Sequence, residues 1–152
     1  DRLIPDIYRF AKKNKKIILR NPNSTRPWQH VLEPLSGYLL LAEKLSKNKL
    51  NKVDQNWNFG PNISNCKSVK YIANYFAKSL KLEIKIAKNN SKNFKPETSY
   101  LRLSNYKARK VLKWHPRWSL NKSLNKILEW NNNAKSKGYK KVCEDQIKNY
   151  LS

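Results

Sequence analysis

The sequence predicts an α/β protein. Segments with apolar residues at helical spacing alternate with short runs that are β-branched or that alternate between apolar and charged residues. The 152 residues are 39% hydrophobic and include five Trp and eight Tyr, which is enough for a globular core. There are only three glycines, so the sequence lacks the glycine cluster that lets a backbone approach a dinucleotide.

The individual elements follow from these patterns. Helices are expected where apolar residues recur every three or four positions, at residues 3–11, 33–45, 69–80, 105–112, 120–134 and 140–151. Strands are expected at residues 17–19, 28–31, 57–61, 82–86 and 100–103. Two polar stretches, residues 46–56 and 88–95, are expected to be loops. The apolar side of the second helix should consist of Leu35, Leu39, Ala42 and Leu45.

Two arginines flank a stiff loop that follows the first predicted strand. Arg20 and Arg26 enclose the residues Asn-Pro-Asn-Ser-Thr, and we call residues 20–26 the elbow. Proline fixes the backbone φ, and the small polar residues supply hydrogen-bond donors. A guanidinium donates paired hydrogen bonds to phosphate oxygens, so the elbow suits a diphosphate. The alternative is that both arginines are ordinary solvated surface residues.

The charge balance raises a different possibility. Thirty-three basic against 10 acidic side chains give a net charge of +23, which suggests nucleic acid or an anionic membrane as a partner. However, 26 of the basic residues are Lys, and Lys and the 20 Asn are spread along the entire chain without an Arg-rich stripe. A general Lys and Asn bias explains the charge better. We therefore expect neither nucleic acid nor a membrane as a partner.

Cysteine and histidine give little indication of a special site. Cys66 and Cys143 are isolated from each other, and His30 and His115 do not complete a zinc-binding pattern with them. No metal site is expected. The sequence contains no apolar run near the twenty residues that span a bilayer, so a reduced, cytoplasmic protein is expected.

Four stretches together resemble the nucleotide-sugar dehydratases of the extended short-chain dehydrogenase/reductase family. They are DRLIPD…ILRNPNSTRPWQHVLEPLSGYLLLAEKL in residues 1–45, WNFGP at 57–61, KARKVLKWHPRW at 107–118 and DQIKNY at 145–150. The resemblance implies that residues 1–152 form the C-terminal, substrate-binding part of a Rossmann-type fold. It also implies that elements at about residues 28–61 pack on a nucleotide-binding sheet. Because the sequence has no methionine and no glycine fingerprint, we expect the NAD-binding half to be absent from it.

The resemblance also implies which residues contact a sugar nucleotide. By motif position, Arg2, Leu3, Ile4 and Pro5 approach the diphosphate, Ile18, Leu19 and Arg20 lie beside the nucleobase, Arg26 contacts phosphate, Asn58 lines the nucleotide pocket, and Glu97 completes the set. For Asn58 the alternative is a strand-end residue that caps backbone. The chain departs from the family near its C-terminal part, where Lys95-Pro96-Glu97-Thr98 replaces Pro-His-Glu-Ala, Ser104 replaces Asp and Lys113 replaces Gly.

The catalytic signature of the family, a Tyr and a Lys four residues apart, occurs twice in this sequence. The pairs are Tyr8 with Lys12 and Tyr106 with Lys110. Chance pairs are expected with eight Tyr and 26 Lys, and both pairs lie in segments that resemble parts of the family away from its active centre. We therefore expect no catalytic residue in this chain.

For the complete enzyme, the resemblance implies conversion of CDP-glucose to CDP-4-keto-6-deoxyglucose with loss of water. Enzyme-bound NAD serves as the cofactor, and the product serves deoxysugar and surface-polysaccharide biosynthesis, such as that of O antigen and lipopolysaccharide. This chain would supply sugar-nucleotide binding only, and the complete enzyme would be a homo-oligomer. The alternatives are a related nucleotide-sugar epimerase or reductase, and a non-enzymatic basic protein that binds nucleic acid.

Overall fold

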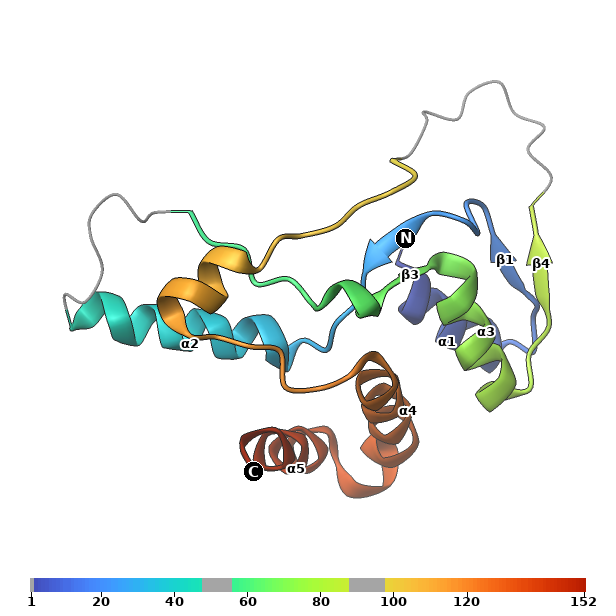
Figure 1. The fold of residues 1–152 in the computed structure, drawn as a ribbon. Coiled ribbons are helices and arrows are strands. Elements are labelled where there is room, and N and C mark those ends of the chain that lie inside the picture. Colours follow the sequence, from blue (N-terminus) through green and yellow to red (C-terminus); the bar gives the residue numbers. More distant parts are fainter. Residues whose placement is uncertain (1, 48–55, 88–97) are drawn as a thin grey trace. The chain divides into compact units, whose positions relative to one another are not determined.

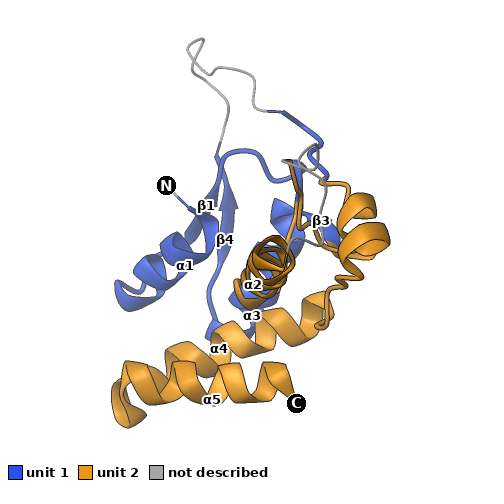
Figure 2. Ribbon diagram, turned by 90° about the vertical axis from the view of Figure 1, so that its left-hand side faces the viewer, with its two compact units in different colours: residues 1–26, 66–102 blue, residues 27–65, 103–152 orange. Residues whose placement is uncertain are grey.

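A computed structural model describes residues 2–47, 56–87 and 98–152. The chain forms two compact units, each assembled from two separate stretches of sequence. Unit 1 comprises residues 1–26 and 66–102, and unit 2 comprises residues 27–65 and 103–152 (Figure 2).

Unit 1 is a small α/β unit around a pair of parallel strands. Its elements are α1 (Leu3–Lys12), β1 (Ile17–Leu19), most of β2 (Thr25–Pro27), β3 (Cys66–Ser68), α3 (Val69–Leu80) and β4 (Ile84–Ile86) (Figure 1). Strands β1 and β4 are parallel, with Ile17 opposite Ile84. Both α1 and α3 contact β1, and fully buried side chains from all three elements, Ile7, Ile17, Ile72 and Phe76, form the core. The apolar faces that the sequence predicts for α1, β1 and α3 are therefore buried against one another within this unit.

The second strand pair of unit 1 joins the elbow to the beginning of α3. Strand β2 pairs with β3, and Thr25 also forms a parallel bridge with Tyr100. Helix α3 begins directly after β3, and the hydroxyl of Ser68 caps it by accepting a hydrogen bond from Tyr71 N at 3.1 Å. The elbow is thereby attached to a helix rather than left as an independent loop.

Unit 2 is mainly helical. Its elements are α2 (Leu32–Ser46), the 3₁₀ turn η1 (Ile63–Asn65), the π-helical turn η2 (Ala108–Leu112), α4 (Leu120–Lys137) and α5 (Tyr139–Leu151). Phe59, Ala108, Leu112 and Trp114 form a buried cluster against which α2 packs. The ring of Phe59 meets that of Trp114 edge to face, with centroids 5.2 Å apart.

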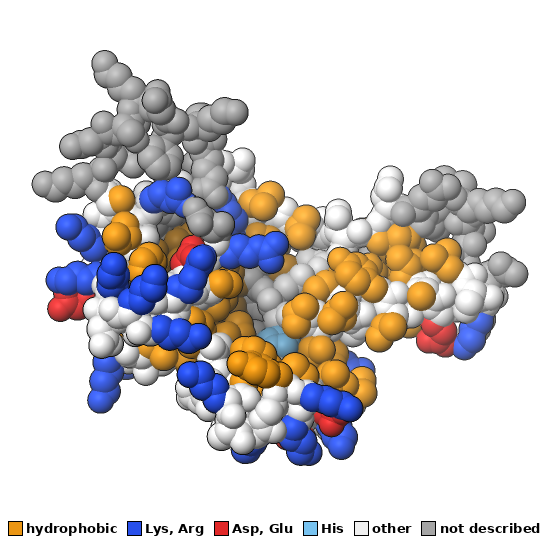
Figure 3. Space-filling view, turned by 180° about the vertical axis from the view of Figure 1, so that it is seen from behind, with side chains coloured by type: hydrophobic (Ala, Val, Ile, Leu, Met, Phe, Trp, Pro, Cys, Tyr) orange, Lys and Arg blue, Asp and Glu red, His pale blue; other side chains and the backbone are white. Residues whose placement is uncertain are grey.

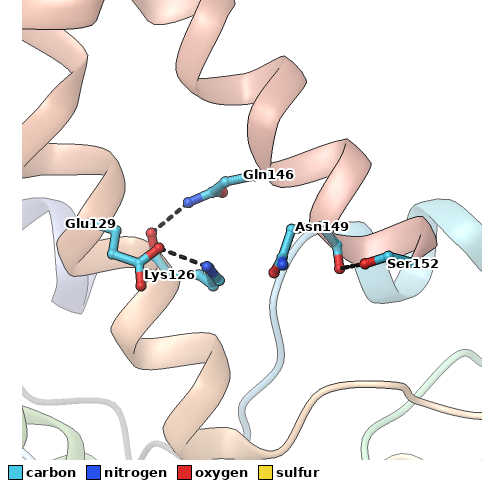
Figure 4. A network of polar contacts seen from close by, with 5 residues as sticks. All are labelled: Lys126, Glu129, Gln146, Asn149 and Ser152. Atoms are coloured by element: carbon cyan, nitrogen blue, oxygen red, sulfur yellow. Dashed lines mark hydrogen bonds and ion pairs between the residues drawn. The ribbon is translucent and has the colours of Figure 1, made fainter.

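Helices α4 and α5 form a hairpin that closes unit 2. Gly138 joins them with a φ of 83°, a backbone conformation that glycine adopts without strain. The side-chain amide of Gln146 on α5 donates to Lys126 O on α4 at 2.6 Å, and Lys126 forms an ion pair with Glu129 at 2.7 Å (Figure 4). A small hollow of about 160 Å³ lies beside these residues, and both acidic and basic side chains line it.

Most of the predicted elements are present, and several bounds differ. The helices predicted at 3–11, 33–45, 69–80, 120–134 and 140–151 match α1 to α5, and the strands predicted at 17–19 and 82–86 match β1 and the shorter β4. The predicted helix at 105–112 is largely the π-helical turn η2. The predicted loops 46–56 and 88–95 fall mostly outside the described residues.

Three strand predictions are wrong. Residues 28–31 are not a strand, because His30 O already accepts a hydrogen bond from Glu33 N at the start of α2, and the strand lies earlier, at Thr25–Pro27. Residues 57–61 are extended without forming a strand, and side chains hold their carbonyl groups (see below). Of residues 100–103, only Tyr100 takes part in a bridge.

The predicted apolar side of α2 is not the side that packs within unit 2. Leu35, Leu39 and Leu45 are exposed, Leu39 to 74%, and Ala42 is exposed as well. The face that packs within unit 2 instead carries Glu33 and Gly37, with Leu40 and Leu41 partly buried. The helix is therefore apolar on more than one side, and Figure 3 shows hydrophobic side chains gathered along it.

Candidate functional site

The elbow of unit 1 follows the carboxyl end of β1, and Arg20 is its first, exposed residue. In open α/β sheets, ligands bind outside the carboxyl ends of the parallel strands. A short turn joins the end of α1 to the start of β1, and Lys15 N donates to Phe10 O at 2.9 Å within it. Helix α1 and strand β1 therefore run in opposite directions, so the beginning of α1 lies toward the same edge as the elbow.

Backbone hydrogen bonds make the elbow rigid. Pro22 O accepts a hydrogen bond from Lys70 N at 2.8 Å, and Ser24 O accepts one from Val69 N at 2.9 Å. Both donors belong to the first turn of α3, whose N–H groups have no partner within the helix. The elbow thus caps α3 while α3 fixes the elbow. An anion bound here would be held by side chains, since these amides are already used.

Arg26 lies half-buried next to the segment in which Tyr100 forms a bridge with Thr25. Its Nη1 donates to Thr98 O at 2.8 Å and to its own neighbour Thr25 O at 2.9 Å. The backbone hydrogen bonds of this bridge run from Thr25 N to Ser99 O at 2.8 Å and from Leu101 N to Thr25 O at 3.1 Å. The guanidinium group is therefore held in one position by backbone, with its charge at the end of the elbow.

The other predicted site residues of unit 1 differ in how accessible they are. Arg2 is exposed and caps the first turn of α1, where its carbonyl accepts from Asp6 N at 3.0 Å. In the same turn, Leu3 and Ile4 are half-buried and Pro5 is exposed. Ile18 is 53% exposed, whereas Leu19 is 2% exposed and belongs to the core. Only the first of these two strand residues has a side chain open to a ligand.

Asn58 belongs to unit 2 and lies in an extended segment, residues 56–61. The side chains of Trp57 and Phe59 on either side of it pack on the apolar cluster, and Asn58 itself is exposed. Asn58 thus has a solvent-accessible side chain between one half-buried and one buried aromatic residue. Glu97, the remaining predicted site residue, lies outside the described residues.

The two Tyr and Lys pairs of the sequence lie in different surroundings. Tyr106 is 66% exposed, and Lys110 Nζ lies 5.7 Å from the centroid of its ring in a cation–π geometry. Tyr8 packs its ring edge to face on Phe76 in the core of unit 1. Lys12 is exposed at the end of α1.

Unit 2 contains a buried, multiply hydrogen-bonded side chain that the sequence patterns did not indicate. Glu33 is fully buried, and its carboxyl group accepts hydrogen bonds from Arg117 N at 3.0 Å, Trp118 N at 2.8 Å and Tyr150 Oη at 2.7 Å. Ser36 Oγ lies 3.0 Å from Tyr150 Oη and accepts from Trp114 Nε1 at 2.9 Å. We call these residues the Glu33 cluster.

The Glu33 cluster is structural rather than catalytic in its geometry. Its bonds join the start of α2 to the 114–118 connector and to the end of α5, and its polar atoms are enclosed by aromatic rings. Burial, together with the hydrogen bond to Glu33, raises the pKa of Tyr150 to about 12. The sequence feature that could have indicated this cluster is Glu33 itself, an acidic residue just before Pro34 in the first turn of an apolar helix.

His30 packs beside the cluster, with its ring 4.9 Å from that of Trp118. Its Nδ1 accepts a hydrogen bond from Leu32 N at 3.3 Å. Burial lowers the pKa of His30, a hydrogen bond with Gln146 partly offsets this, and the charge of Lys126 lowers the pKa further. The surroundings of His30 thus favour the neutral imidazole.

The three glycines of the chain do not form a dinucleotide site. Gly37 lies within α2, Gly60 lies in the extended segment and Gly138 joins α4 to α5. None of them is in a turn between a strand and a helix, where a pyrophosphate-binding backbone needs glycine. Within the described residues there is likewise no group of three metal-ligating side chains, and no helix there is long and apolar enough to cross a membrane.

Comparison with known proteins gives a sequence relative and several structural ones. No protein-family model matches the chain. The chain is 43% identical over 130 residues to CDP-glucose 4,6-dehydratase of Salmonella typhimurium, a match that covers 86% of this chain. The chain spans only 36% of the length of that curated relative.

Three solved structures share the fold. They are dTDP-glucose 4,6-dehydratase of Bacillus anthracis in complex with NAD (TM-score 0.68, 19% identity), RMD of Pseudomonas aeruginosa complexed with NADPH (0.61, 17%) and WbmG of Bordetella bronchiseptica in complex with NAD and UDP (0.58, 13%). The match to the Bacillus anthracis dehydratase covers 93% of this chain and 42% of that one. The match to RMD covers 84% of this chain and 39% of that one, and the match to WbmG covers 91% of this chain and 40% of that one. The chain is thus a relative of CDP-glucose 4,6-dehydratase over most of its own length, with the α/β fold of part of an extended short-chain dehydrogenase/reductase enzyme.

Proposed function

We propose that this chain is the sugar-nucleotide-binding portion of a CDP-glucose 4,6-dehydratase, which converts CDP-glucose to CDP-4-keto-6-deoxyglucose with loss of water. The observation that carries the proposal is the 43% identity to the Salmonella typhimurium dehydratase over 86% of this chain. The elbow supports it, because two guanidinium groups on a rigid loop suit the diphosphate of the substrate. The complete enzyme is a homo-oligomer in the cytoplasm, acting in deoxysugar biosynthesis for surface polysaccharides such as O antigen.

In this proposal the residues of this chain bind and orient the substrate. Arg20 and Arg26 contact the diphosphate, together with the turn formed by Arg2, Leu3, Ile4 and Pro5. Ile18 lies beside the nucleobase, with Leu19 supporting it from the core, and Asn58 and Glu97 make further contacts with the sugar nucleotide. Binding of this kind contributes to the reaction by orientation and exclusion of water.

NAD does not fit this chain, because none of its glycines lies in a strand-to-helix turn. The cofactor, and the Tyr and Lys that act with it, therefore belong to a nucleotide-binding portion outside these 152 residues, on the same or another polypeptide. The exposed apolar face of α2, which includes Leu35, Leu39 and Leu45, packs on the sheet of that portion. Elements at about residues 28–61 thus belong structurally with it.

A calorimetric titration of the protein with CDP-glucose tests the site. Replacing Arg20 or Arg26 by Ala should weaken binding by about tenfold to a hundredfold, since a charge-assisted hydrogen bond contributes about 1.5–3 kcal/mol. Arg102→Ala is the matched control, because this exposed arginine lies outside the elbow, over the ring of Tyr100. Equal affinity in the wild type and both elbow variants would contradict the proposed site.

Product analysis separates the dehydratase from a related epimerase. The protein is combined with a nucleotide-binding portion of the dehydratase relative and NAD, and then incubated with CDP-glucose. A dehydratase yields a nucleotide sugar lighter by one water, whereas an epimerase leaves the mass unchanged. Mass spectrometry of the product therefore decides between the two.

A further inference from the structure

Segment 56–61, which carries Asn58, is held by side chains, and within the described parts of the chain it pairs with no strand. Gln29 Nε2 donates to Phe59 O at 2.8 Å, Asn105 Nδ2 donates to Gly60 O at 3.0 Å, and Lys107 Nζ donates to Asn56 O at 3.1 Å. These three donors come from two parts of unit 2 that are far from the segment in sequence. Together they bond carbonyl groups on both sides of Asn58.

The attachment is specific in its geometry. The Asn105 amide also lies 3.4 Å from Pro61 O, and Lys107 Nζ sits 4.5 Å from the centroid of the Trp57 ring while it bonds Asn56. Gln29 and Asn105 are half-buried, so their bonds are shielded from competing water. The backbone at Gly60 also lies close to Leu103, since a Cβ added there would be 2.7 Å from Leu103 O.

We propose that Gln29, Asn105 and Lys107 are positioning residues that fix the direction of Asn58 and so its contact with the sugar nucleotide. This inference rests on the proposed function for the ligand, and on the hydrogen bonds above for the positioning. The positioning residues themselves need not touch the substrate. A segment without a strand partner has no backbone ladder to set its register, so the side-chain donors supply what pairing supplies in a sheet.

The first test is a double-mutant cycle on CDP-glucose affinity. Asn105→Ala and the equally shaped Asn105→Asp, which removes the donor, should each weaken binding by about fivefold to tenfold. In an Asn58→Ala background, the same changes should have almost no further effect, because the side chain that they orient is gone. Arg109→Ala is the control, since Arg109 bonds the side chain of Asn62 just beyond the segment and should leave the affinity unchanged.

The second test needs no ligand. Amide hydrogen exchange of residues 56–61 should be faster in Asn105→Ala and Gln29→Ala than in the wild type, and unchanged in Arg109→Ala. Effects on affinity that simply add to that of Asn58→Ala, or unchanged exchange in the segment, would overturn the inference. Failure of the wild type to bind CDP-glucose would instead contradict the proposed function, and the exchange measurement would still decide whether these side chains hold the segment.

Discussion

The buried carboxyl group of Glu33 joins three parts of unit 2 through its hydrogen bonds. It accepts hydrogen bonds from two consecutive backbone amides, those of Arg117 and Trp118, and from the hydroxyl of Tyr150. These partners come from positions more than 80 residues away in sequence. A buried polar group is tolerated in a core when its hydrogen bonds are made, and it is costly once a partner is removed.

Replacing Glu33 by Ala should lower the free energy of unfolding by about 3–5 kcal/mol, because three buried donors lose their acceptor at once. Tyr150→Phe removes only one of the three bonds and should cost about 1–2 kcal/mol. Urea titration of both variants measures the difference. Glu144→Gln, on the exposed side of α5, should change the stability by no more than about 0.5 kcal/mol. Equal losses for Glu33→Ala and Tyr150→Phe would contradict this role.

His30 should make the stability of unit 2 decrease at acidic pH. Burial lowers the pKa of His30 in the folded protein below the unfolded value of 6.5, so the unfolded state binds a proton more readily. The contribution of neutral His30 to the free energy of unfolding is therefore fully present above pH 6.5. It decreases as the pH falls from 6.5 toward the pKa that His30 has in the folded protein. Protonation would also remove the Nδ1 acceptor that Leu32 N uses.

His30→Phe should lose less stability between pH 7.5 and pH 5 than the wild type does. The comparison of urea midpoints at the two pH values measures this, and the carboxyl groups common to both proteins cancel from the difference. His115→Phe is the matched control, since this histidine is exposed. An equal acid-induced loss in the wild type and His30→Phe would show that burial of His30 does not contribute.

Helix α2 shows how one close approach decides which side of an element packs inward. A Cβ placed on Gly37 would lie 2.2 Å from Cδ1 of Phe59, so the helix can approach the aromatic cluster only with glycine there. The approach brings Glu33, one turn earlier, to the connector at residues 114–118. The leucines at positions 35, 39 and 45 are consequently exposed.

Gly37→Val should therefore destabilise the protein by about 1–3 kcal/mol through overpacking. Ala42→Val places the same side chain on an exposed position of the same helix and should cost less than about 0.7 kcal/mol, the difference in helix propensity. Thermal unfolding of the two variants provides the measurement. If both variants lost equal stability, helix propensity rather than the contact with Phe59 would explain the result.

At the scale of the whole molecule, the charge of +23 and the sugar-nucleotide site predict binding that depends on salt to different degrees. Figure 3 shows many Lys and Arg side chains on the surface. A basic protein that contacts six to ten phosphates along duplex DNA loses about a thousandfold or more in affinity between roughly 50 and 200 mM salt. CDP-glucose has only two phosphate groups, so its binding should change far less.

Titrations of the protein with CDP-glucose and with an unrelated DNA duplex at the two salt concentrations measure both responses. We expect DNA binding that is weak and disappears at the higher salt, and CDP-glucose binding that persists. Salt-resistant, sequence-selective DNA binding together with no affinity for CDP-glucose would favour the non-enzymatic alternative.

The sequence by itself determined the α/β class and the bounds of most helices, because apolar periodicity and capping residues act over a few neighbouring positions. It also determined the elbow, whose prolines and paired arginines are adjacent in the chain. Only the tertiary structure decided which face of α2 is buried, that Glu33 is a core residue, and that side chains from distant positions hold the segment around Asn58. Those outcomes depend on contacts between residues far apart in sequence, such as Gly37 against Phe59 or Glu33 against Trp118, and local patterns carry no information about such pairs.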